Sequence, residues 1–168
     1  VLCTDKTGTL TLNQMTVVEL RTGAQLAPLP LPLHGTDTVL DEAARRMIGI
    51  GRLACQPEPF DPMEKAFHDL ARQPMAGGTA PQRDEPAELI HTYPFSPELL
   101  AMSNVWRMAD GTLLIATKGA PEAIAGLCGL DPAAHAALRA PTDEMAARGM
   151  RVLGVAQATR PPTRPPTH

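Results

Sequence analysis

The stretch ELIHTYPFSPELLAMSNVWRMADGTLLIATKGAPEAI, residues 88–124, decides the fold. Three strand-like runs lie within it, at 88–95, 101–108 and 112–117. Asp110-Gly111 separates the last two runs, and this dipeptide favours the tight turn of a hairpin. Pro121 then suits the first position of a helix. The stretch therefore predicts antiparallel strands followed by a helix.

Two helices are predicted before these strands. Thr38 and Asp41 resemble a capping pair, and apolar residues then recur at helical spacing at positions 40, 44, 47 and 48. Asp61 suits an N-cap and Pro62 suits the first helical position, so a second helix is predicted to begin there.

Further elements are predicted on both sides of this central part. Short strands are predicted at 1–4, 15–21 and 151–159. The prolines of 27–35 favour an exposed loop there. Near the C-terminus, Asp131 and Thr142 are each predicted to start a helical piece, and Gly149 to end the second one.

The order of these elements indicates the fold class. Because the strands are mostly adjacent in sequence and the helices are inserted in blocks, we predict an α+β protein with a mainly antiparallel twisted sheet flanked by helices. The 168 residues, of which 43% are hydrophobic, suffice for one domain with a core. A net charge of −3 and scattered basic residues give no reason to expect a nucleic-acid partner.

Other classes of protein are disfavoured by composition. The three cysteines form no CxxC pair and suggest reduced thiols. The five histidines are not spaced as metal ligands, so we expect no zinc site. No apolar run approaches the ~18 residues that a spanning helix needs, so we expect the chain to act in water.

The segment DKTGTLT, residues 5–11, places an acid before a run of small residues. The carboxylate of Asp5 could attack a phosphoryl group if the phosphate charge is neutralised and the geometry is in line. Gly8 permits a tight turn, and the hydroxyl groups of Thr7 and Thr9 can approach phosphate oxygens. The alternative is that Asp5 only caps a turn.

The longer segment VLCTDKTGTLT resembles the phosphorylation loop of P-type cation-transporting ATPases, in a calcium-pump-like form, which belong to the haloacid-dehalogenase-like phosphotransferases. The resemblance implies that Asp5 is the phosphorylated nucleophile, with Lys6 and Thr7 as catalytic neighbours. It also implies that Asp5 and Thr7 hold Mg²⁺ in the intact pump. Related phosphatases carry a second aspartate at the position of Thr7, and threonine cannot activate water in that way, so an aspartyl phosphate would be long-lived.

Four further segments resemble parts of the nucleotide-binding domain of the same family: DPMEKA (61–66), YPFSPELLAMS (93–103), LIATKGAPEAI (114–124) and GMRVLGVA (149–156). The resemblance implies that Phe95 stacks on adenine, with Met102 nearby, and that Lys118 lies deep in the ATP pocket. Gly119 would leave room for a ring beside that lysine. The alternatives are that Phe95 is an ordinary core residue and that Lys118 is a solvated residue in a turn.

The remaining nucleotide contacts come from the other two segments. The resemblance implies that Glu64 accepts a hydrogen bond from the adenine amino group, that Arg151 reaches the phosphates and that Leu153 lines the base pocket. Alternatively, Glu64 completes a capping box with Asp61. Pro97 and Leu100 stand where calcium-pump members carry basic residues, which predicts weak nucleotide affinity.

These similarities predict a division of the chain into a phosphorylation loop and hinge (1–16), a nucleotide-binding domain (17–159) and a disordered tail (160–168). We expect a monomeric piece from the cytoplasmic face of a larger multi-pass membrane pump, with ATP and the remaining pump domains as partners. By itself the chain would bind ATP without turning it over. The alternative is a haloacid-dehalogenase-like phosphatase or kinase-like phosphotransferase that is active by itself.

Overall fold

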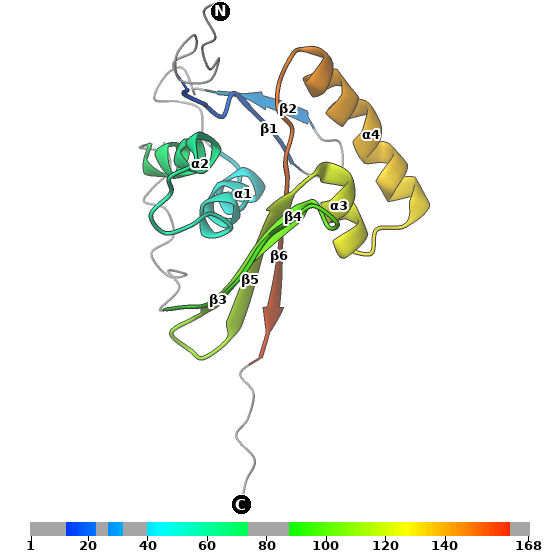
Figure 1. The fold of residues 1–168 in the computed structure, drawn as a ribbon. Coiled ribbons are helices and arrows are strands. Elements are labelled where there is room, and N and C mark those ends of the chain that lie inside the picture. The colour runs from blue at the N-terminus through cyan, green and yellow to red at the C-terminus, as the bar shows by residue number, and fades with distance from the viewer. Residues whose placement is uncertain (1–12, 23–26, 32–39, 74–87, 162–168) are drawn as a thin grey trace, which may run out of the picture.

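The computed structural model describes residues 13–22, 27–31, 40–73 and 88–161 (Figure 1). Within these ranges the elements, in chain order, are β1 (Glu19–Thr22), β2 (Ala27–Pro30), α1 (Glu42–Leu53), α2 (Pro62–Arg72), β3 (Glu88–Ser96), β4 (Ala101–Arg107), β5 (Leu113–Gly119), α3 (Pro121–Leu127), α4 (Pro132–Ala147) and β6 (Gly154–Arg160). None of the helices in the described ranges is long and apolar enough to cross a membrane.

The main sheet contains four strands in the order β3-β4-β5-β6, each antiparallel to its neighbour. The predicted hairpin joins β4 to β5, and Gly111 has a φ of +83°, the left-handed conformation that the turn demands of this residue. The α+β class with a mainly antiparallel sheet is therefore confirmed. The last strand begins at Gly154 rather than at the predicted residue 151, and it includes Arg160.

A second sheet consists of β1 and β2 only. The prediction of an exposed loop at 27–35 was wrong for its first part, because Ala27–Pro30 forms β2. Prolines are tolerated there because each strand of a two-stranded sheet has one free edge, where no N–H donor is needed. The strand predicted at 15–21 is shorter than expected and begins at Glu19.

The two N-terminal helices begin at aspartate caps. Oδ1 of Asp41 accepts from the N–H of Ala44 at 2.7 Å, so Asp41 itself is the N-cap of α1. Thr38, which the sequence suggested as the cap, lies outside the described residues. Asp61 caps α2 as predicted, with Pro62 in the first turn.

The C-terminal helical region is one helix rather than the two predicted pieces. Helix α4 continues through Pro141, although proline lacks the N–H that would bond four residues back. The hydroxyl of Thr142 donates to the carbonyl of Leu138 at 2.7 Å in this turn. Gly149 follows the C-cap with a φ of +79°, which confirms its predicted role in ending the helix.

Helix α1 lies between the two sheets and contributes to two apolar clusters. One joins it to the small sheet and α2, and comprises Leu20, Leu31, Leu40, Ala44, Ile48 and Leu70. The other joins it to the main sheet, and comprises Ile50, Leu53, Ala54, Leu114 and Ala116. The first cluster contains three of the four positions predicted at helical spacing. Ala44 and Ile48 lie on the buried face of α1, whereas Leu40 precedes its N-cap.

Candidate functional site

The end of β5 presents a buried ammonium group to α2. Nζ of Lys118 lies 2.5 Å from Oε1 of Glu64, and only 6% of Lys118 and 8% of Glu64 is exposed. Lysine and glutamate are almost never buried unless paired, because each charge loses its hydration. The alternative of a solvated lysine in a turn was therefore wrong, and the pair fixes the start of α2 against the end of β5.

Glu64 faces Lys118 rather than its own N-cap. Oε1 accepts from Lys118, and Oε2 accepts from the backbone N–H of Gln56 at 3.4 Å. The side chain of Asp61 alone accepts from the N–H groups of Met63 and Glu64. A capping box would turn the glutamate back towards residue 61, so the contacts favour an inward role for Glu64.

Two further side chains lie beside the Lys118 ammonium. Sγ of Cys55 lies 3.1 Å from Nζ of Lys118, and the ring centroid of Phe67 lies 5.9 Å from the same atom. Burial raises the pKa of the Cys55 thiol to about 11, although the neighbouring ammonium opposes the shift. Burial likewise lowers the pKa of His68, whose Nε2 lies 3.0 Å from the Gln56 carbonyl. The thiol and the imidazole are therefore both neutral near pH 7.

The sheet register brings Phe95, Met102 and Lys118 into one row across three strands. Met102 is directly opposite Lys118 on β4 and β5. The partners on β3 shift between Tyr93 and Ser96, which leaves Pro94 and Phe95 facing Met102. Since neighbouring side chains alternate between faces, Phe95 lies on the face of Met102 and Lys118. Two strand spacings separate its backbone from that of Lys118, roughly 10 Å.

Phe95 is 58% exposed, so the alternative of an ordinary core phenylalanine was wrong. Neither of the two cavities described below is lined by Phe95, Met102 or Lys118.

Gly119 has a different role from the one the sequence suggested. A Cβ added there would lie 2.4 Å from the carbonyl oxygen of Leu100 and 2.7 Å from Cα of Ala101. The space beside Gly119 is therefore filled by the β3–β4 turn rather than left open for a ring. Only glycine fits at position 119, because the neighbouring backbone comes so close.

Arg151 and Leu153 precede β6 and line a cavity of about 400 Å³. Met63 and Phe67 of α2 line the same cavity, as do residues 14–21 of the N-terminal segment. Phe67 also lies beside the Lys118 ammonium. This ring therefore lies between the buried Lys118 on one side and the cavity lined by Arg151 and Leu153 on the other. Arg151 is exposed.

Asp5, Lys6 and Thr7 lie outside the described residues, so the phosphorylation loop remains a sequence prediction. Sequence reasoning did not identify Cys55 and Gln56 as neighbours of the pair. Neither residue belongs to a motif, and only the fold brings the connector between α1 and α2 against β5.

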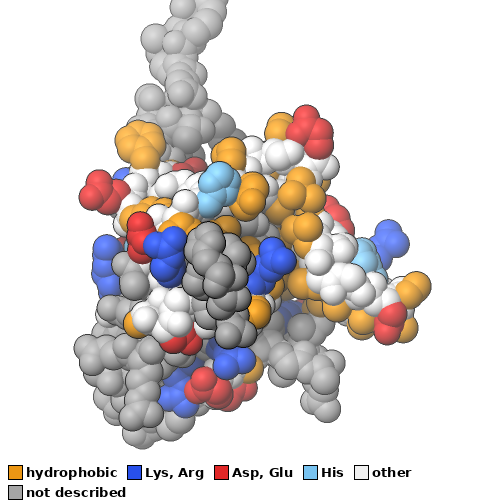
Figure 2. All heavy atoms as spheres, turned by 90° about the horizontal axis from the view of Figure 1, so that it is seen from below, with side chains coloured by type: hydrophobic (Ala, Val, Ile, Leu, Met, Phe, Trp, Pro, Cys, Tyr) orange, Lys and Arg blue, Asp and Glu red, His pale blue; other side chains and the backbone are white. Residues whose placement is uncertain are grey.

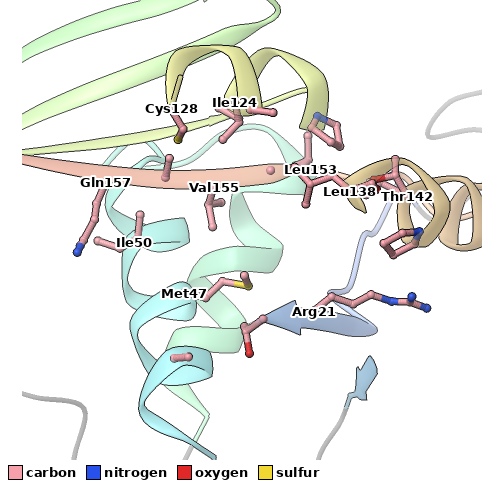
Figure 3. A pocket seen from close by; sticks show the side chains of 18 of the residues that line it. Arg21, Met47, Ile50, Ile124, Cys128, Leu138, Thr142, Leu153, Val155 and Gln157 are labelled. Carbon is pink, nitrogen blue, oxygen red and sulfur yellow. The ribbon is translucent and has the colours of Figure 1, made fainter. Parts of the chain in front are cut away.

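A larger cavity of about 730 Å³ lies between α1, α3, α4 and β6 (Figure 3). Met47, Ile50 and Val155 point into it from α1 and β6, and Leu138 and Met145 line it from α4. None of the α4 side chains is buried. Figure 2 shows hydrophobic side chains gathered on the side of the molecule where α3 and α4 lie. Among the predicted site residues that the structure describes, Leu153 alone lines this cavity.

Comparison with known proteins finds relatives but no matching family model. The chain is similar to named ATPases. It is 32% identical over 167 residues to a "Probable cation-transporting ATPase I" of Mycobacterium tuberculosis, in strains CDC 1551 / Oshkosh and ATCC 25618 / H37Rv, covering 94% of this chain and 10% of the relative. It is 34% identical over 158 residues to a "Probable plasma membrane ATPase" of Dictyostelium discoideum, covering 92% of this chain and 13% of the relative.

These relatives support the similarity to cation-transporting ATPases that the motifs indicated. The chain spans only about a tenth of the length of the curated relatives it matches. Activities that belong to the whole of such a protein are therefore considered below as proposals.

Proposed function

We propose that this chain is the ATP-binding part of a P-type cation-transporting ATPase and delivers ATP for phosphorylation of Asp5. The observation that carries the proposal is the row of Phe95, Met102 and Lys118, with Glu64 paired to the lysine. The names of the relatives support the coarser part of the proposal, that the chain is a segment of an ATPase. On this proposal, the chain works with the remaining domains of a pump at the cytoplasmic face of a membrane.

Each residue of the site contributes a different interaction to nucleotide binding. Adenine stacks on the exposed ring of Phe95, which is worth about 1–3 kcal/mol per base. The ammonium of Lys118 donates to the base from the floor of the site, and Glu64 balances its charge. Arg151 reaches the phosphates, for which a guanidinium is suited because its fork is planar and always charged.

Residues 13–16 would act as the hinge that carries the nucleotide to Asp5. Asn13 has a φ of +47°, a conformation that asparagine tolerates better than most residues, and it precedes β1 without regular structure. In the intact pump, the Asp5 carboxylate attacks the γ-phosphorus and ADP leaves. Mg²⁺ held by Asp5 and Thr7 would neutralise phosphate charge in that step.

The proposal is tested by following backbone amide resonances while Mg-ATP is added. We expect shifts at Phe95, Lys118 and Arg151. Phe95→Ala should weaken binding by about 5- to 150-fold, because the stacking platform is lost. Tyr93→Ala is the matched control, since Tyr93 is also 58% exposed on the same strand but its neighbours place it on the other face. Equal losses in both variants, or shifts confined to other residues, would refute the site.

A second experiment separates binding from chemistry. The chain is incubated with radiolabelled Mg-ATP and examined for an acid-stable, hydroxylamine-labile label. We expect no label on the chain by itself. A label that disappears in Asp5→Asn would show that the chain phosphorylates itself, and turnover of a simple phosphomonoester would favour the phosphatase alternative.

A further inference from the structure

The connector between α1 and α2, residues 54–61, contacts both members of the Lys118–Glu64 pair. Sγ of Cys55 lies 3.1 Å from the Lys118 ammonium, and the next residue, Gln56, donates its backbone N–H to Glu64 at 3.4 Å. We propose that this connector holds the pair in position for the nucleotide, with Cys55 and Gln56 as positioning residues. The inference rests on the proposed function.

The connector is itself held by three neighbouring elements. The carbonyl of Cys55 accepts from Nδ2 of Asn104 on β4 at 2.8 Å. The thiol of Cys55 donates to the carbonyl of Gly51 on α1 at 3.2 Å. The carbonyl of Gln56 lies 3.0 Å from Nε2 of His68 on α2. Displacement of either connector residue would therefore break contacts to α1, α2 or the sheet, which makes the connector a rigid support.

The thiol can orient the ammonium without changing the charge balance of the site. An ammonium group has three N–H donors, and the carboxylate of Glu64 and the sulfur of Cys55 accept two of them. Since its pKa is raised to about 11, Cys55 is a neutral thiol at pH 7, and Glu64 alone balances the lysine charge. Among the described residues the third N–H of Lys118 has no hydrogen-bond acceptor, and on the proposed function it donates to the base.

The two described cysteines provide a matched pair of variants. Cys55 is buried, whereas Cys128 is exposed at the end of α3. We expect Cys55→Ala to weaken Mg-ATP binding roughly fivefold, as loss of one weak hydrogen bond to a charged group would. Cys55→Ser, whose hydroxyl can accept from the ammonium, should remain within about twofold of the original chain. Cys128→Ala should bind Mg-ATP unchanged.

A measurement without nucleotide keeps this inference separate from the proposed function. The ¹H–¹⁵N resonance of the Lys118 side chain, recorded in the free protein, should move in Cys55→Ala and remain in place in Cys128→Ala. If Cys55→Ala does not fold, Cys55→Val fills the space of the thiol without an acceptor and replaces it in both measurements.

An unmoved resonance, or an affinity for Mg-ATP equal to that of the original chain, would overturn the positioning role. If the resonance moves but the original chain binds no adenine nucleotide, the connector still positions the pair while the proposed function fails. A fivefold loss in Cys55→Ser as well as in Cys55→Ala would also contradict the inference, because the serine restores the acceptor.

Discussion

Gly119 and Leu100 approach each other so closely that no side chain fits between them. The N–H of Ala120 donates to the Leu100 carbonyl at 2.9 Å, and a Cβ on Gly119 would lie 2.4 Å from that oxygen. Leu100 itself has a φ of +55°, so the turn that fills this space is already in an unfavourable conformation. The end of β5, where Lys118 is located, is thereby fixed against the start of β4.

Gly119→Ala should therefore destabilise the protein. The clash is with backbone, which cannot move aside as a flexible side chain would, so we expect the free energy of unfolding to fall by about 1–3 kcal/mol. Gly126→Ala is the control, because nothing lies within 4 Å of its added Cβ and the residue is helical. That variant should gain about 0.5–1 kcal/mol. Urea unfolding measures both, and an unchanged Gly119→Ala would contradict the packing.

Replacing one member of the Lys118–Glu64 pair should lower the free energy of unfolding strongly. Lys118→Met leaves a buried carboxylate without its counter-charge, so we expect a loss of about 3–5 kcal/mol in the free energy of unfolding. Adding Glu64→Gln removes the unpaired charge and should recover part of that loss. Denaturant unfolding of the single and double variants measures the difference.

The exposed pair of Arg72 and Asp69 provides the comparison. Their side chains are 71% and 70% exposed, and a hydrogen-bonded pair on one helix turn is worth about 0.5 kcal/mol or less. Arg72→Met should therefore change unfolding by no more than that amount. A Lys118→Met variant as stable as Arg72→Met would show that the buried pair contributes little.

Local rules predicted most of the fold. The Asp110-Gly111 hairpin, the Asp61-Pro62 helix start and the glycine end at Gly149 depend on neighbouring residues only, and all three are present. Predictions were wrong where contacts between residues far apart in sequence determine the structure. Pro28 could not be recognised as part of a strand, because β2 exists only through its pairing with β1.

The candidate site could be predicted only in part for the same reason. The motifs identified Glu64 and Lys118 separately, and only the fold shows that one neutralises the other. The interpretation that Gly119 leaves room for a ring was wrong, since the backbone of Leu100 fills that space. The sequence did not indicate a role for Cys55, because the residue that it contacts, Lys118, lies 63 positions away in the chain.

Asn104 joins the connector to the main sheet. Among the polar residues that the structure describes, its replacement should lower the free energy of unfolding by one of the largest amounts. Its side chain is 0% exposed, and Nδ2 donates to the carbonyls of Leu53 at 3.0 Å and Cys55 at 2.8 Å. The indole of Trp106 also donates to Leu53, so Asn104→Leu leaves mainly the Cys55 carbonyl unpaired. We expect a loss of about 1–3 kcal/mol in unfolding free energy.

Thr92→Val is the matched change for Asn104. It removes the hydrogen bond from the threonine hydroxyl to Oδ1 of Asn104 at 2.9 Å, so the buried Oδ1 loses its donor, but both carbonyls stay satisfied. Its cost should be about 1 kcal/mol. If Thr92→Val is more destabilising than Asn104→Leu, the carbonyl contacts of Asn104 are not the main stabilisation of the connector.

Glu19 should make the stability of the protein sensitive to acid. Burial by itself would raise the pKa of this carboxyl, but hydrogen bonds from Arg21 at 2.7 Å and from Arg148 outweigh it, so the pKa is lowered from its ordinary value of 4.5. A lowered pKa in the folded state means that the unfolded chain binds the proton more readily. The stabilisation is therefore complete above about pH 4.5 and is lost as the pH falls through the lower folded value.

Glu19→Gln tests this relationship through the slope of stability against pH. The variant should be less stable at pH 7, because β1 loses its ion pairs to Arg21 and to Arg148 at the end of α4. Between pH 5 and pH 3, its unfolding free energy should fall less steeply than that of the original chain. Glu58→Gln, which alters an exposed glutamate of the connector, is the control for the loss of one negative charge. Parallel curves for the Glu19 variant and the original chain would show that Glu19 does not titrate differently in the folded and unfolded states.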